Sequence, residues 1–194
     1  DGVWEGEQLL PEGWAAEVRE NRVSTHLEAN PDWAEGYGFQ VWMARHGYRG
    51  DGAFGQFCVI LPEQDAVLVT TMATEDMQAV LDAAWAHLLP AFGEDGEGEE
   101  ADEALAERLR SLLLPPTEGA ATGSGPGSWA GSGLTATLDG DAVVLADDTT
   151  TLRLPVGAPG WTTLEGPPPV AVSGGWQGGT LLLDLAFLES PHRL

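Results

Sequence analysis

Residues 35–73 read EGYGFQVWMARHGYRGDGAFGQFCVILPEQDAVLVTTMA, and the pattern of this stretch decides which fold the sequence predicts. It holds three runs rich in β-branched and aromatic residues, at 37–45, 53–61 and 66–73. Gly47 and Gly50 lie between the first two runs, and a Pro-Glu-Gln-Asp turn lies between the last two. Turn residues between alternating runs are typical of tight connections, so the stretch predicts antiparallel hairpins.

A helix is predicted directly after these strands, at residues 76–91. Its apolar residues recur at spacings of three and four: Met77, Val80, Leu81, Ala84, Trp85 and Leu88. That spacing forms one apolar stripe, which can lie on a sheet. Three strands followed by a helix predict the α+β class, with an antiparallel sheet under a covering C-terminal helix. A shorter amphipathic helix is predicted upstream, at residues 10–21.

The composition changes after residue 92. Residues 93–103 contain only glycine and acidic residues apart from Ala101, which predicts a solvated linker. Residues 104–114 predict a helix that Pro115 stops, and the Gly/Ser/Thr/Pro-rich residues 117–128 predict a spacer.

Short alternating runs then predict a small all-β module, and the apolar run at its end suggests that the module is truncated. Its turns are expected at Asp139-Gly140, Gly157 and Gly174-Gly175. Its tryptophans are spread singly over several elements, which favours core positions over a carbohydrate platform. The predicted domains are 1–92, the linker, helix and spacer 93–128, and the β-module 129–194.

The charge of the chain excludes several classes of function. Eight arginines, no lysine and thirty-one acidic residues give a net charge of −23. This charge repels nucleic acid and anionic membrane surfaces, so we expect neither as a partner. Without lysine, this polypeptide cannot form a Schiff base or a Ser/Lys nucleophile pair. Cys58, the single cysteine, lies in an apolar run that predicts a buried thiol, and we expect a cytoplasmic protein.

The segment Gly50-Asp51-Gly52-Ala53-Phe54-Gly55 fits the dinucleotide pattern G-x-G-x-x-G. In a dinucleotide fold this loop opens a helix, whereas strand-forming residues follow here, so we expect no nucleotide cofactor. The four histidines lack metal-ligand spacing, and no serine occupies a G-x-S-x-G elbow. We therefore expect no cofactor, no metal and no complete catalytic set in this chain.

Three pieces carry a resemblance in their order and spacing: Gly36-Tyr37-Gly38-Phe39, Gly50-Asp51-Gly52 and Pro62-Glu63-Gln64-Asp65. Together they resemble the C-terminal part of the catalytic domain in the penicillin-binding-protein and β-lactamase superfamily. The likeness is strongest to class C-like β-lactamase-related serine hydrolases. It covers residues 1–92, and a β-rich appendage, for which residues 117–194 are the candidate here, also occurs in relatives.

The resemblance implies a cleft wall formed by Gly50, Asp51, Gly52, Ala53 and Phe54. Gly50, Asp51 and Gly52 take the places of a Lys-Thr-Gly or His-Thr-Gly triad, and only the last glycine agrees. Asp51 then either accepts a hydrogen bond, from substrate or from the upstream tyrosine of the family, or is a plain hairpin-turn residue. An edge strand after Gly52 would offer an oxyanion-hole N–H, from Phe54 or, in the other register, from Ala53.

In that family the Ser-x-x-Lys pair and the Tyr-x-Asn or Ser-x-Asn element precede this region. We therefore expect both upstream of Asp1, in a missing N-terminal catalytic portion, and expect this chain alone to be inactive. The parent would act on a small-molecule acyl substrate with an ester, amide or β-lactam-like bond, through an acyl-enzyme. The alternatives are a non-catalytic ligand- or protein-binding module on a degenerate hydrolase scaffold, and an unrelated free-standing α+β domain.

Overall fold

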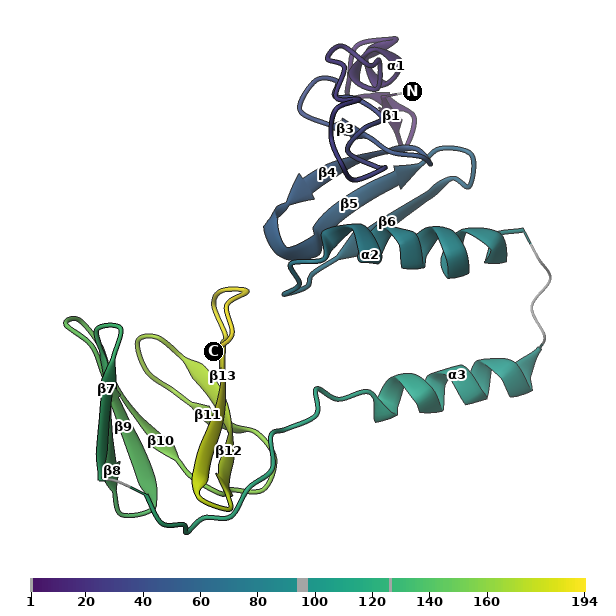
Figure 1. The fold of residues 1–194 in the computed structure, drawn as a ribbon. Helices are drawn as coiled ribbons and strands as arrows, with labels where there is room; N and C mark the ends of the chain where they lie inside the picture. Colours follow the sequence, from purple (N-terminus) through teal and green to yellow (C-terminus); the bar gives the residue numbers. More distant parts are fainter. Residues whose placement is uncertain (1, 94–97, 126) are drawn as a thin grey trace. The chain divides into compact units, whose positions relative to one another are not determined.

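The computed structural model describes residues 2–93, 98–125 and 127–194. The chain divides into two compact units, Asp1–Glu97 and Gly98–Leu194, both drawn in Figure 1. None of the helices in these described ranges combines the length and the apolar character that crossing a membrane requires.

The first unit is built around a four-stranded antiparallel sheet with the order β3-β4-β5-β6 (Figure 1). Its strands are β3 (Trp42–Met43), β4 (Tyr48–Gly52), β5 (Gln56–Leu61) and β6 (Ala66–Thr70). The 3-10 turn η1 (Ala53–Gly55) joins β4 to β5. The hairpin of β1 (Val3–Trp4) and β2 (Glu7–Gln8) and the short helix α1 (Trp14–Val18) precede the sheet.

A helical segment packs against one face of this sheet. It begins as α2 (Met77–Ala83) and continues as the π-turn η2 (Ala84–Leu88) and the 3-10 turn η3 (Leu89–Ala91). The buried core joins both layers: Phe57, Val59 and Leu61 come from β5, and Leu81, Ala84 and Trp85 come from the helical segment. Burial of each large apolar side chain contributes about 1.5–3 kcal/mol, so this cluster holds the unit together.

The thiol of Cys58 is exposed, which corrects the predicted buried thiol. Side chains alternate along a strand, and Cys58 lies between the inward-facing Phe57 and Val59 of β5. The apolar run around Cys58 suggested burial of every side chain, but only the side chains on one face of β5 are buried.

The α+β class predicted from the sequence is wrong. The described part of the chain is mostly β, with four antiparallel sheets, 35% of residues in strands and 19% in helices. The helix expected at 10–21 is helical only over Trp14–Val18, because Gly13 before it takes a left-handed backbone with φ of 81°. The strand expected at 37–45 shrinks to β3, because Gln40 also takes a positive φ, 58°.

The second unit contains two antiparallel sheets, with the orders β10-β9-β8-β7 and β11-β12-β13. The first consists of β7 (Ser128–Gly131), β8 (Leu134–Asp139), β9 (Ala142–Ala146) and β10 (Thr151–Pro155). The second consists of β11 (Thr162–Leu164), β12 (Val170–Gln177) and β13 (Thr180–Phe187). Leu154 of β10 shares one buried cluster with Val170, Val172 and Leu185 of the other sheet, so the two sheets pack face to face.

The turn predicted at Gly174-Gly175 is wrong, because both glycines lie inside β12. The chain at Ala120 crosses here and exchanges backbone hydrogen bonds of 2.9 Å with Trp176 in both directions. A Cβ on Gly175 would lie 2.7 Å from the Ala120 carbonyl oxygen. Glycine is therefore needed for a close backbone approach, and the chain reverses later, between Gln177 and Thr180.

Helix α3 (Glu99–Ser111) opens the second unit and begins earlier than the predicted 104–114. Three acids in its first turn favour this start, because negative charge stabilises a helix N-terminus. The predicted linker 93–103 thus overlaps the helix, and its residues 94–97 lie outside the described residues.

Candidate functional site

The candidate residues Gly50, Asp51 and Gly52 form the end of β4. On one side they pair with β5, in the register Gly50↔Cys58, Asp51↔Phe57 and Gly52↔Gln56. On the other side β3 pairs only with the beginning of β4, at Tyr48 and Arg49. Within the described ranges no strand pairs with that second edge from Gly50 onward. The backbone of the Gly-Asp-Gly segment therefore lies on an open sheet edge.

Ala53 and Phe54 do not lie on an edge strand, as the resemblance had implied, but in the turn η1. Phe54 takes a left-handed backbone with φ of 63° and ψ of 27°, and its carbonyl oxygen accepts a hydrogen bond of 3.2 Å from the Thr74 N–H. The strand β5 begins only at Gln56. A helical residue followed by a left-handed one is the arrangement of an anion-binding backbone nest, in which successive N–H groups converge.

The Asp51 side chain lies on the covered face of the sheet and is 8% exposed. Its Oδ2 accepts a hydrogen bond of 3.1 Å from Nε of Arg49. Burial raises the pKa of the Asp51 carboxyl, and the charge of Arg49 opposes this shift. The structure thus places this carboxylate against a buried guanidinium.

Gly50 lies on the opposite face from Asp51, where side-chain space is open. A Cβ added to Gly50 would meet only the Cβ of Cys58, at 3.8 Å. This position can therefore hold a side chain, and glycine here is not a steric requirement.

Arg49 is fully buried and links β4 to the segments around it. Its Nη1 donates to the carbonyl oxygens of Asp32, at 3.1 Å, and Met43, at 2.6 Å. Its guanidinium stacks over Trp33, 4.3 Å from the ring centroid. Burial lowers the pKa of Arg49, and the charge of Asp51 opposes this, so the guanidinium stays protonated at neutral pH.

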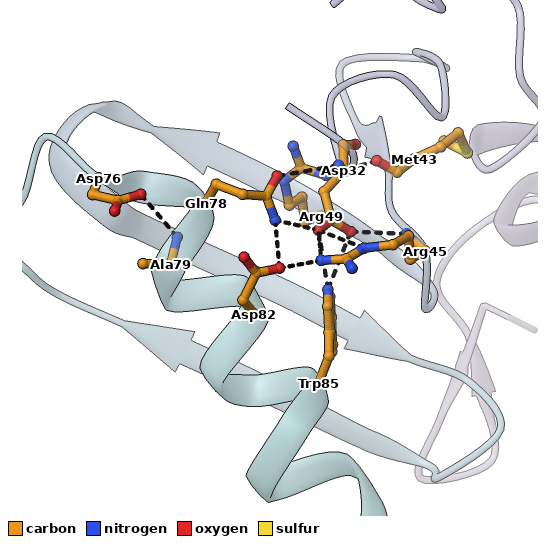
Figure 2. Close-up of polar contacts among 9 residues, drawn as sticks. All are labelled: Asp32, Met43, Arg45, Arg49, Asp76, Gln78, Ala79, Asp82 and Trp85. Atoms are coloured by element: carbon orange, nitrogen blue, oxygen red, sulfur yellow. Dashed lines mark hydrogen bonds and ion pairs between the residues drawn. The ribbon is translucent and has the colours of Figure 1, made fainter. Parts of the chain in front are cut away.

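Asp32 is the centre of the polar network drawn in Figure 2 and is completely buried. Arg45 donates to it from its backbone N–H at 2.9 Å, from Nε at 3.0 Å and from Nη2 at 2.7 Å. Gln78 of α2 donates at 2.7 Å, and the indole N–H of Trp85 donates at 3.1 Å. One carboxylate thereby ties the 30–34 loop, the β3–β4 turn and the helical segment together.

Burial opposes the ionised form of Asp32, but the hydrogen bonds from Arg45, Gln78 and Trp85 outweigh it. They hold the pKa of Asp32 below its usual value of 3.8. All of these donors belong to the β3–β4 turn and the helical segment, which pack around β4. The Asp32 carboxylate therefore serves to position these elements. Asp32 was missed from the sequence, because its partners lie 13 to 53 residues away and no local motif marks it.

Comparisons with protein-family models, curated proteins and solved structures found no match to this chain. In the described part of the chain, no group of three or more His, Cys, Asp and Glu side chains is placed to hold a metal ion.

Proposed function

We propose that this chain forms one wall of the acyl-substrate cleft in a β-lactamase-related serine hydrolase. Its nucleophile and general base would lie upstream of Asp1, and the parent would be cytoplasmic. The observation that carries the proposal is the open edge of β4 at Gly50, Asp51 and Gly52, which runs directly into the η1 turn. An extended substrate can pair with an open edge as an added strand, through backbone hydrogen bonds.

The η1 turn supports a role in stabilising the oxyanion that forms during acyl transfer. Acyl transfer needs N–H donors aimed at the developing oxyanion, and backbone donors persist when side chains change. The nest-like backbone of Ala53 and Phe54 lies at the end of the open edge, next to where a paired substrate would end. The Lys-Thr-Gly side chains of the resembled family are absent here, but their absence does not affect hydrogen bonds donated by backbone N–H groups.

The exposed face of the sheet supports a missing catalytic portion. The edge strand β6 carries Val67 and Val69, which are 60% and 65% exposed, and Cys58 is exposed on the neighbouring strand. Apolar residues on an uncovered sheet face and edge favour association with another layer. In this proposal that layer is the upstream part of the parent protein.

The proposal is tested by reading the coding sequence immediately upstream of Asp1. An in-frame Ser-x-x-Lys followed by Tyr-x-Asn or Ser-x-Asn would support it, and a stop codon or unrelated sequence there would overturn it. A fluorophosphonate probe gives the second test: it should label the longer protein and leave the isolated 194-residue chain unlabelled. Stoichiometric labelling of the isolated chain would contradict the assignment of the nucleophile upstream.

A non-catalytic binding module is the second candidate. It is favoured by Gly50, which has no side chain for proton transfer, and by Asp51, whose carboxylate is bound by Arg49. In that case a glycan or peptide would raise the melting temperature of the chain, whereas acyl-enzyme inhibitors would have no effect on the longer protein.

A further inference from the structure

The second unit contains a cavity of about 570 Å³ between its two sheets. Ala136, Val143 and Leu145 line it from one sheet, and Leu181, Leu183 and Leu185 line it from β13 of the other. Small-molecule sites commonly measure about 300–1,000 Å³, so this space has the size of a ligand site.

One end of the cavity is buried, and the other end opens at the surface of the second unit. Val143 and Leu185 are 1% and 3% exposed, whereas Thr180 and Leu134 lie at the surface. Most of the wall consists of the inner faces of β8, β9 and β13, and Trp129 of β7, Gly179 of the β12–β13 turn and Leu194 complete it. A chain-like molecule can therefore enter at the mouth and lie between the sheets.

The chemistry of the walls selects an uncharged ligand. No Asp, Glu, Arg or His lines the cavity, and its polar side-chain groups are the hydroxyl of Thr180 and the indole N–H of Trp129. Thirteen acidic residues and four arginines between residues 98 and 194 give this unit a net charge of −9. Such a surface repels carboxylates and other anions.

We propose that this cavity binds a neutral aliphatic chain, such as a long-chain alcohol or its ester. The hydrocarbon lies against Val143 and Leu185, and the neutral polar end lies at the mouth, beside Thr180. The site depends only on the second unit, so it is independent of the proposed hydrolase function.

The test uses the full 194-residue chain and the neutral probe N-phenyl-1-naphthylamine, whose fluorescence rises in apolar sites. We expect the probe to bind and 1-dodecanol to displace it, with dodecanoate about ten-fold weaker at pH 7, because the unit is anionic. Ala136→Phe fills the cavity and should weaken binding about ten-fold or more. Thr137→Phe, at the next position of β8 and exposed, is the matched control and should bind like the unsubstituted chain.

A second variant removes the dependence on how well Ala136→Phe folds. Thr180→Val keeps the side-chain volume and removes the hydroxyl, so it should weaken dodecanol and leave dodecane unchanged. Near-UV circular dichroism confirms the fold of each variant. The proposal is overturned if dodecanol fails to displace the probe, or if Ala136→Phe and Thr137→Phe weaken binding equally. It is also overturned if sedimentation shows that a second copy of the chain covers the cavity, in a dimer that Ala136→Phe dissociates.

Discussion

Asp32→Asn is the substitution that most directly tests how the site is held. Asparagine keeps the shape of the side chain but removes its charge and turns one acceptor into an NH₂ donor. That donor would face the N–H groups of Arg45, Gln78 and Trp85, all of which now donate to the carboxylate. The substitution therefore weakens the junction between the 30–34 loop, the β3–β4 turn and the helical segment at once.

The expected cost is about 3 kcal/mol. Removing one partner of a buried ion pair typically costs about 3–5 kcal/mol. Arg45 is 35% exposed and keeps its ion pair with Asp82, which places this case at the lower end. For a unit of this size each 1 kcal/mol shifts the melting temperature by about 4–8 °C, so we expect a loss of about 12 °C or more.

The pH dependence gives an independent check. The pKa of Asp32 is lower in the folded protein than its usual value of 3.8, so its stabilisation is fully present above that value, from about pH 5 upward. It is lost as the pH falls through the folded pKa. The difference between the unsubstituted chain and Asp32→Asn should therefore shrink in acid.

The assay is urea unfolding followed by tryptophan fluorescence, at pH 7 and again near pH 3. Glu63→Gln is the control, because Glu63 is exposed in the β5–β6 turn and should change stability by less than about 0.5 kcal/mol. A cost below about 1 kcal/mol for Asp32→Asn at pH 7, or an equal cost at both pH values, would refute this account of the network.

Three further predictions concern single positions. Gly175→Ala should destabilise the second unit by about 1–3 kcal/mol in thermal unfolding, because its Cβ would meet the backbone of the crossing chain, whereas Gly166→Ala, with open space around it, should be neutral. The thiol of Cys58 should react with Ellman's reagent in the native chain without a lag, and a reaction only after unfolding would contradict its exposure. In a carboxyl ¹³C NMR titration Asp51 should titrate above 3.8 and Asp32 below it, and the reverse order would show that the two environments are misassigned.

Much of the strand pattern could be read from the sequence. The strands β5 and β6 lie within the runs predicted at 53–61 and 66–73, and β8, β9 and β13 lie in the predicted all-β module, because alternation of apolar and polar residues is a local property of the chain. The β1–β2 hairpin and the strands β4, β7 and β11 were missed. The strand β4 occupies the segment with Gly47 and Gly50 that was predicted to connect two runs, and the other strands have only two to four residues, which carry too little of that alternation.

The predictions that failed involve contacts between distant segments. Gly174-Gly175 has the composition of a turn, and only the crossing of Ala120 over β12 shows why two glycines lie inside a strand. The predicted α+β fold class was wrong because local periodicity indicates which residues form helices and strands. It does not fix the share of the chain that is found in helices or in sheets.

The sequence by itself determined the charge, the absence of lysine and the order of most strands, since composition and side-chain alternation are properties of neighbouring residues. Tertiary structure alone decided that Asp32 is the centre of the polar network, that Asp51 faces Arg49 and that β4 has an open edge at Gly50. The Asp32 network and the open edge depend on hydrogen bonds, or on missing strand pairs, between segments far apart in the sequence. Arg49 and Asp51 are only two residues apart on β4, but their ion pair is buried only once the chain is folded.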